Sequence, residues 1–196
     1  MTNPGLVTLV VVASMLGVGD AAGQPAAQRR PALTRVAVPV AAVTVDDGDT
    51  VEIRWTPTDI ETVRILGIDA PETRHLEHNI PFDQPFGPEA RAFGQGVLAT
   101  ARDVVILRAA TTDPFGRSLA YLLVDGRNYS VLMVSARLAV ESVTAFGDNG
   151  LPMEAAAVVA AAKVAGPVAF EPPHAYRSRM RDVAEWLKAR RQYPPP

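Results

Sequence analysis

The sequence contains no cysteine, and this excludes three kinds of chemistry at once. Disulfide cross-links, a thiolate nucleophile and thiolate zinc sites all require that residue. Hydrophobic residues make up 48% of the 196-residue chain, so a core of ordinary size can form without cross-links. The lack of cysteine therefore carries little information about the compartment.

The chain also lacks an excess of positive charge. It has 19 Lys and Arg against 21 Asp and Glu, which gives a formal net charge of −2. Proteins that bind nucleic acid through their overall field carry a strong positive charge. Any polyanion bound by this chain must therefore be held by local cations.

The most apolar run, residues 6–19, is too short to span a bilayer comfortably. It has the length of a signal-peptide core, and small residues suitable for cleavage follow between 21 and 27. Residues 1–5 lack the Lys or Arg that usually precedes such a core. We predict that residues 1–27 are a signal peptide, giving a secreted or periplasmic protein, or an uncleaved membrane anchor. Residues 28–35 would be a linker.

Five segments have the β-branched or alternating pattern of strands. They are residues 36–45, 51–55, 62–68, 104–107 and 117–124. Short turns join the first three, which predicts a meander. Helical spacing is found in four further segments. They are residues 88–101, 131–138, 151–166 and 174–191. The basic residues of the last helix, Arg177 among them, are interpreted as a solvated surface.

This order of elements predicts an α+β, mainly β fold. We expect a five-stranded Greek-key barrel of the OB type with about three packed helices. An Ala-rich helical segment at about residues 151–173 is interpreted as an insertion. The domain would cover residues 36–191, and residues 192–196 would be a Pro-rich tail.

A charged stretch lies at the end of the third predicted strand. Arg64 projects from the strand, Asp69 ends it, and Pro71 stops it because proline has no N–H. In a meander, the turn after the first strand lies at the same end of the sheet, so Asp49 can approach Asp69. Taken alone, the stretch is explained equally well by a surface ion pair.

The residue types at this end of the sheet suit metal-assisted phosphodiester hydrolysis. Two carboxylates and a backbone carbonyl make a hard oxygen site for Ca²⁺ and, less readily, Mg²⁺. Arg64 and Arg117 can supply paired donors to a phosphate. Together with a spare carboxylate, these groups meet the need for charge neutralisation and an activated water.

Four motifs resemble those of the staphylococcal nuclease (thermonuclease) family in order and spacing. They are Asp-Gly-Asp-Thr (47–50), Arg-Ile-Leu-Gly-Ile-Asp-Ala-Pro-Glu-Thr (64–73), Phe-Gly-Pro-Glu-Ala (86–90) and Asp-Pro-Phe-Gly-Arg-Ser-Leu-Ala-Tyr (113–121). The match covers about residues 36–140 and, more loosely, the final helix. It implies an OB-fold, calcium-dependent nuclease acting on DNA and RNA.

The resemblance assigns a metal site residue by residue. It implies that Asp49 and Asp69 are the carboxylate ligands of Ca²⁺ and that Ala70 adds its main-chain carbonyl. Asp47 would hold these ligands in position without binding the metal itself, and Thr50 would be a hydrogen-bond partner of the site.

The resemblance also assigns the reacting groups. Glu72 would hold or deprotonate the attacking water, and Arg64 and Arg117 would bind the scissile phosphate. Phe115 stands where the staphylococcal enzyme has a tyrosine that contacts the nucleotide. The family's tyrosine-bearing segment is not matched around residues 143–146.

Two other interpretations remain open at this stage. The first is a non-catalytic OB-fold module that binds nucleic acid or a protein. The second is a transition-metal site at His75 and His78, completed by Glu72 or Glu77. In the leading interpretation the protein is a monomer, its partner is the DNA or RNA substrate, and no stable protein partner is implied.

Overall fold

The structure is a computed structural model, and it describes residues 25–195. The predicted export segment, residues 1–27, lies outside these residues except for its last three positions. Among the described residues, no helix combines the length and the apolar character needed to cross a membrane.

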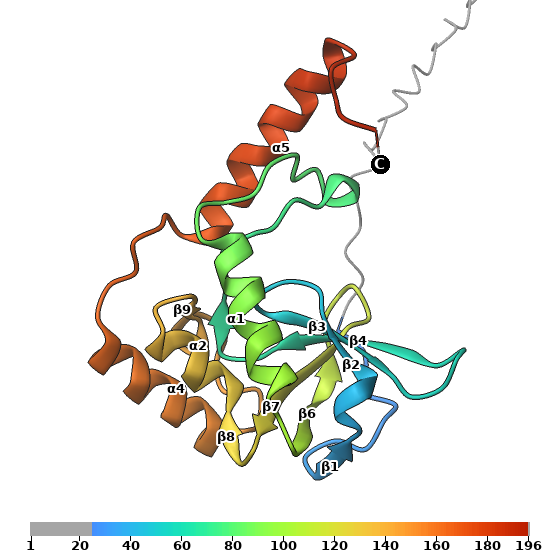
Figure 1. Cartoon of the computed structure of the whole chain (residues 1–196), viewed down its shortest axis with the longest axis vertical. Helices are drawn as coiled ribbons and strands as arrows, with labels where there is room; N and C mark the ends of the chain where they lie inside the picture. Colours follow the sequence, from blue (N-terminus) through green and yellow to red (C-terminus); the bar gives the residue numbers. More distant parts are fainter. Residues whose placement is uncertain (1–24, 196) are drawn as a thin grey trace, which may run out of the picture.

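One mixed sheet carries the fold (Figure 1). Its strands are β1 (Arg35–Val38), β2 (Val43–Val45), β3 (Thr50–Arg54), β4 (Ile60–Ile65), β6 (Val104–Thr112), β7 (Ser118–Val124) and β8 (Arg127–Asn128). The order is β1-β6-β7-β4-β3-β2, with β8 paired to β7. Neighbours are antiparallel except β4 and β7, which run parallel. The resulting half-barrel is consistent with the predicted OB-like α+β class.

The first predicted strand, residues 36–45, is wrong as a single element. The chain forms β1, then the 3-10 turn η1 (Val40–Ala42), then β2. Pro39 follows β1 directly and cannot donate to a strand ladder. Because β1 pairs with β6 and β2 pairs with β3, this broken strand occupies both edges of the sheet and helps it to curl. With this division and the short unpredicted strand β8, the sheet has seven strands within residues 25–195 where five were predicted.

The third predicted strand, residues 62–68, is also interrupted. Gly67 has a φ of 80°, a left-handed conformation that glycine adopts readily, and it turns the chain after β4. The next strand, β5 (Ile68–Asp69), leaves the main sheet and pairs with β9 (Val140–Glu141). This turn places Asp69 beside the end of β4 instead of along it.

Residues 25–195 form five α-helices, of which α1, α2 and α4 pack on the core of the sheet. They are α1 (Gly87–Ala99), α2 (Tyr129–Ser135), α3 (Val143–Phe146), α4 (Pro152–Ala165) and α5 (Pro173–Ala189). The predicted helices are confirmed to within a few residues. The N-cap of α2 is Asn128, whose side chain accepts from the Ser130 N–H. The Ser130 hydroxyl donates to the Leu66 carbonyl at 2.7 Å.

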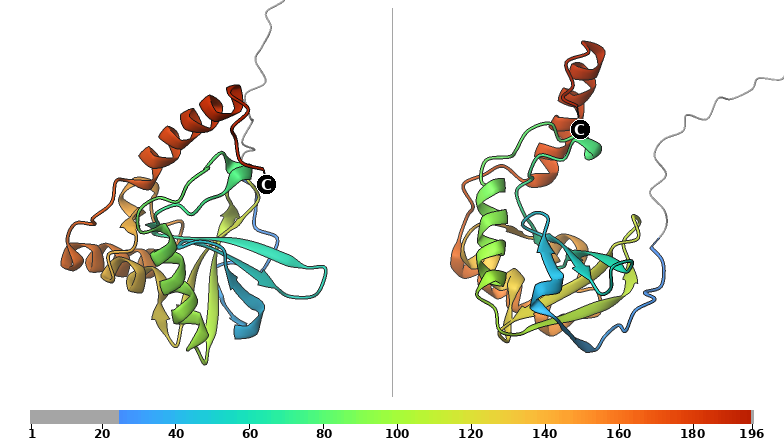
Figure 2. Two further views of the ribbon diagram at one scale, coloured as in Figure 1. Left: turned by 45° about the horizontal axis from the view of Figure 1, so that its top comes forward. Right: turned by 45° about the vertical axis from the view of Figure 1, so that its right-hand side comes forward.

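The buried apolar side chains form two separate clusters. The larger fills the half-barrel and extends under α1, α2 and α4. The smaller consists of Ile80, Tyr176 and Met180, with Val183 packed against it. It joins α5 to the loop of residues 74–86, which includes the 3-10 turn η2 (Leu76–His78). Figure 2 shows α5 beside this loop and away from the barrel.

Candidate active site

Arg64 lies between two of the predicted carboxylates. Its Nη1 donates to Asp49 Oδ1, and its Nη2 donates to Asp69 Oδ1 at 2.8 Å. Asp49 is only 2% exposed, and Asp69 is also buried. The turn before β3 and the short strand β5 therefore bring their carboxylates to one guanidinium at the end of β4.

The turn that carries Asp49 is held by hydrogen bonds on both sides. Asp49 N–H donates to Asp47 Oδ1 at 2.9 Å, and Thr50 Oγ1 donates to Asp49 Oδ1 at 3.3 Å. On the other side, Ala70 N–H donates to Asp49 Oδ2 at 2.7 Å. Gly48 allows this approach, because an added Cβ would lie 2.6 Å from the Cβ of Ala70.

Glu72 is fixed by its main chain to the loop that precedes α1. Its N–H donates to Gln84 Oε1 at 3.1 Å, and its carbonyl accepts from Gln84 N–H at 2.8 Å. Gly87 packs against the same carbonyl, where an added Cβ would be 2.2 Å away. The backbone of Glu72 is therefore held in a fixed position beside Asp69.

Arg177, from α5, enters the same group of carboxylates. Its Nη1 and Nη2 donate to the two Asp69 oxygens at 3.0 and 3.1 Å, and Nη1 also donates to Glu72 Oε1. The interpretation of this residue as part of a solvated surface is wrong. No local signal in the sequence singles out Arg177, because Arg54, Arg64 and Arg74 all lie closer in sequence to these carboxylates.

Arg117 is not in contact with this group. Its Nε donates to Asp113 Oδ2 at 2.7 Å, and Asp113 Oδ1 accepts from the N–H groups of Phe115 and Arg117. Arg117 directly precedes β7, whose Leu119 is in register with Arg64 on β4. It therefore lies just before the neighbouring strand, beside Phe115, a residue that is 74% exposed.

The crowding of charges changes the pKa values of the carboxyl groups. Burial raises the pKa of Asp49 to about 7, against the effect of Arg64 and with added repulsion from Asp47 and Asp69. Burial also raises the pKa of Glu72, although Arg177 opposes it. For Asp69, burial acts in the same direction, but hydrogen bonds and charges from Arg177 and Arg64 outweigh it and lower the pKa.

The donor set around Arg64 fits a hard divalent cation. Within the described part of the chain, Asp49 Oδ2 and Asp69 Oδ2 each accept a single hydrogen bond, from the Ala70 N–H and from Arg177, so each oxygen keeps a lone pair for a cation. Two other groups of possible ligands lie nearby in the described residues. His75, Glu77 and His78 form one, and Asp46, Asp47 and His75 form the other.

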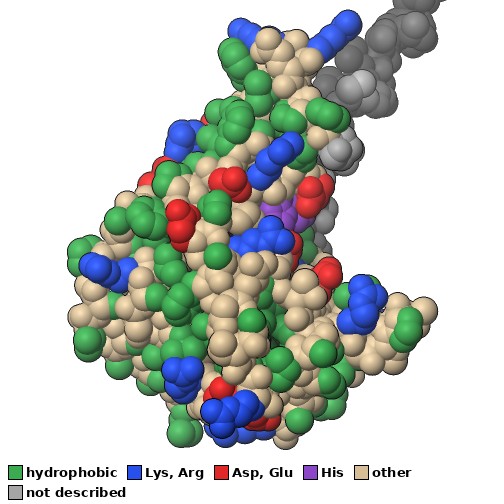
Figure 3. Space-filling model, viewed as in Figure 1, with side chains coloured by type: hydrophobic (Ala, Val, Ile, Leu, Met, Phe, Trp, Pro, Cys, Tyr) green, Lys and Arg blue, Asp and Glu red, His purple; other side chains and the backbone are tan. Residues whose placement is uncertain are grey.

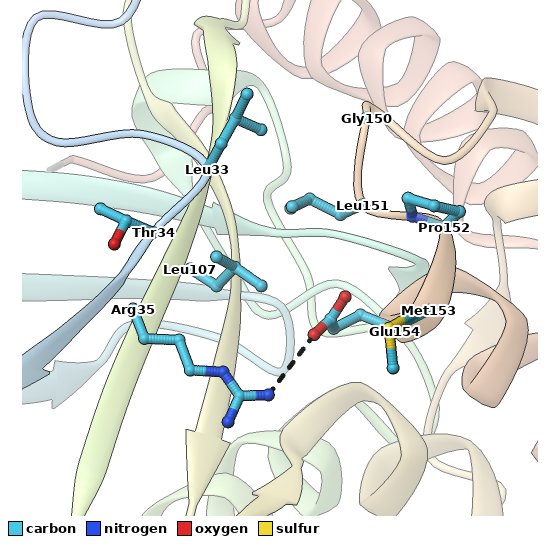
Figure 4. A pocket seen from close by; sticks show the side chains of 9 residues that line it. All are labelled: Leu33, Thr34, Arg35, Leu107, Gly150, Leu151, Pro152, Met153 and Glu154. Carbon is cyan, nitrogen blue, oxygen red and sulfur yellow. Dashed lines mark ion pairs between the residues drawn. The ribbon is translucent and has the colours of Figure 1, made fainter.

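A separate pocket lies away from these residues (Figure 4). It has a volume of about 570 Å³ and is lined by residues 33–35, Leu107 and residues 150–154. Arg35 and Glu154 face each other across it at 3.8 Å. None of the predicted site residues lines this pocket, so the carboxylates and arginines are not part of it.

The fold and the site together define an OB-like half-barrel with an acidic centre bridged by arginines. The chain belongs to the family described as Staphylococcal nuclease homologue, whose sequence model matches residues 62–165, more than half of the chain. This range includes Arg64, Asp69, Glu72 and Arg117. It also includes α4, whereas Asp49 and α5 lie outside it.

Two curated proteins are similar over part of their length. The chain is 35% identical over 95 residues to the Thermonuclease of Staphylococcus intermedius, covering 48% of this chain and 54% of that protein. It is 31% identical over 101 residues to the SPbeta prophage-derived endonuclease YokF of Bacillus subtilis (strain 168), covering 50% of this chain and 33% of that protein. The chain thus spans about half of the first relative and a third of the second.

Proposed function

We propose that this protein is a calcium-dependent nuclease that hydrolyses phosphodiester bonds in DNA, RNA or both by attack of water. The observation that carries the proposal is the convergence of Asp49, Asp69 and Glu72 around arginines on the half-barrel of this family. The printed names of the two relatives, a thermonuclease and an endonuclease, support the same activity.

The reacting groups have distinct roles in this proposal. Glu72 orients or deprotonates the attacking water, because its carboxylate lies beside the metal ligands and its backbone is fixed by Gln84. Arg64 and Arg117 bind the scissile phosphate and stabilise the charge that develops on it. For this, Arg117 exchanges its partner Asp113 for a phosphate oxygen.

Asp49, Asp69 and the carbonyl of Ala70 would hold the metal ion, with Asp47 fixing the Asp49 backbone N–H and Thr50 fixing the Asp49 carboxylate. A bound Ca²⁺ would neutralise phosphate charge and lower the pKa of a coordinated water. The chain's own contribution is to exclude bulk water from the ligands and to hold their carboxylates at the end of β4.

We also propose that the protein acts as a monomer outside the cell or in the periplasm, with membrane anchoring through residues 1–27 as the alternative. The location in this proposal rests on the short apolar run of residues 6–19 and the small residues that follow it.

The test is cleavage of single-stranded DNA and of RNA by the purified chain in Ca²⁺, in Mg²⁺ and in chelator. We expect cleavage with Ca²⁺ that falls at least about a hundredfold in Glu72→Gln, because general base catalysis contributes about 10²–10⁴-fold. Glu185→Gln, an exposed change of the same kind on α5, is the matched control and should cleave normally. Binding of DNA by a folded chain that cleaves with none of these metals would contradict the nuclease and favour a non-catalytic OB-fold module.

A further inference from the structure

The segment that begins α5 is tied to the backbone of Glu72 through Gln84. This glutamine is 1% exposed, and each of its side-chain polar atoms is used. Its Oε1 accepts from Glu72 N–H at 3.1 Å, and its Nε2 donates to the Glu171 carbonyl at 2.7 Å. A shift of residue 171 is therefore transmitted to the residue proposed as the base.

The rotation of α5 about its axis is also fixed. Tyr176 and Met180 pack on Ile80, and Tyr176 Oη donates to the Phe82 carbonyl at 2.9 Å. These contacts bury one face of the helix against the 74–86 loop. The residue after Tyr176 is Arg177, and the same docking directs its side chain toward the carboxylates.

Arg177 restrains both of the carboxylates that it contacts. Its two terminal nitrogens engage the two oxygens of Asp69, a bidentate pairing that defines the plane of both groups. One of these nitrogens also donates to Glu72 Oε1. Within residues 25–195, Glu72 Oε2 accepts no hydrogen bond, so one oxygen is held while the other is available to a water molecule.

We propose that Arg177 is a positioning residue of the active site, which holds Glu72 through Oε1 so that Oε2 faces the attacking water. This inference rests on the proposed nuclease function. It makes α5, which lies beyond the residues matched by the family model, a part of the active site. Arg177 acts through Glu72 and does not bind the substrate.

The first test compares full-length Arg177→Gln and Arg177→Lys with the parent chain in steady-state cleavage. We expect kcat of the Gln variant to fall about 10- to 100-fold, the usual cost of losing a group that orients a site residue. KM should change less than about threefold, because substrate binding is retained. Lys can reach one carboxylate but lacks the planar fork, so Arg177→Lys should restore turnover only in part.

Arg181→Gln is the matched control, because it removes the same charge from an exposed position one turn along α5. It should leave kcat unchanged. Thermal unfolding checks that all variants are folded at the assay temperature. If Arg177→Gln is not folded, Arg177→Lys, which retains the positive charge, serves as the test variant. Turnover of both Arg177 variants equal to the parent would overturn the proposal. A rise in turnover would also overturn it, because Arg177 would then be blocking the base.

The second test measures binding without cleavage. A labelled single-stranded oligonucleotide is titrated in chelator against Glu72→Gln and against the Glu72→Gln, Arg177→Gln double variant, with fluorescence anisotropy as the readout. A positioning role predicts the same Kd within about twofold, since Arg177 would not touch the phosphate. Clearly weaker binding by the double variant would instead identify Arg177 as a phosphate ligand.

The two hypotheses can fail separately. If the parent chain cleaves and Arg177→Gln cleaves equally well, the role of Arg177 is wrong and the nuclease function stands. If the folded parent chain cleaves nothing, the nuclease function fails, and the positioning role is rejected with it.

Discussion

Glu61 and Arg108 form a buried ion pair inside the half-barrel. Arg108 is 1% exposed, and its Nε and Nη2 donate to the two Glu61 oxygens at 2.7 and 2.8 Å. Ser118 Oγ and Trp55 Nε1 donate to the same carboxylate at 2.6 and 2.7 Å. Burial alone would raise the pKa of Glu61, but these donors outweigh it and lower the pKa.

Replacing Glu61 by Gln should destabilise the fold by about 3–5 kcal/mol at pH 7, because the charge of Arg108 stays buried without its partner. The lowered pKa means that the ionised carboxylate stabilises the fold above its ordinary pKa of 4.5 and that this contribution is lost as pH falls below it. Urea unfolding at pH 7 and pH 3.5 measures both effects. A loss below about 1 kcal/mol at pH 7, or an equal loss at the two pH values, would contradict this account.

At the scale of single residues, the sequence predicted part of the site. The approach of Asp49 to Asp69 follows from the turn chemistry and the meander, and the structure brings both to Arg64. Arg177 could not be placed, because its position depends on how Tyr176 packs against Ile80, more than 90 residues away in sequence. Periodicity shows which face of α5 is apolar, but it does not show what that face meets.

Helix α1 contains two glycines in different surroundings. A Cβ on Gly94 would lie 2.3 Å from Tyr129 Oη, and that hydroxyl donates to the Gly48 carbonyl at 3.1 Å. A Cβ on Gly96 would meet no atom within 4 Å. Gly94 is therefore required by packing between α1 and α2, whereas Gly96 only weakens the helix.

The two alanine variants should change stability in opposite directions. Gly96→Ala should stabilise the protein by about 0.5–1 kcal/mol through helix propensity. Gly94→Ala should destabilise it by about 1–3 kcal/mol, because Tyr129 must move. It should also lower turnover, since Tyr129 holds Gly48 next to Asp49. Thermal unfolding and a cleavage assay measure these effects, and changes of the same sign in both variants would refute the packing argument.

At the scale of elements, the long helices were predicted well because their apolar positions repeat over several turns. The strand boundaries were less predictable. Residues 36–45 are almost continuously apolar, which predicts one strand. In the structure this segment is divided between β1 and β2, which lie on opposite edges of the sheet. The turn at Gly67 also lies inside an apolar run, so no local polarity change marks it.

For the whole molecule, the charge distribution limits how the proposed nucleic-acid substrate can be bound. The formal charge is −2, and Figure 3 shows basic and acidic side chains interspersed on one face, where α5 and the 74–86 loop meet the barrel. No strong overall field attracts a polyanion. Affinity should then come from a few arginines at the end of β4.

The expected consequence is a weak dependence of DNA affinity on salt. If Arg64 and Arg117 neutralise the one scissile phosphate of a single strand, log K should fall with log salt concentration with a slope of about −0.7. Anisotropy titrations of Glu72→Gln between about 50 and 200 mM salt measure this slope. A slope steeper than about −4 would indicate an extended basic surface that this account does not contain.

The docking of α5 has a consequence for the order in which the site is assembled. The carboxylates of the site lie between residues 47 and 72, so they emerge early during synthesis. Arg177 follows Glu72 by 105 positions and comes from the last helix of the described chain. Domains form from the N-terminal side during translation, and distant contacts close late. The carboxylates of the site are therefore synthesised first. The growing chain can complete the site only after α5, which carries Arg177, has been synthesised.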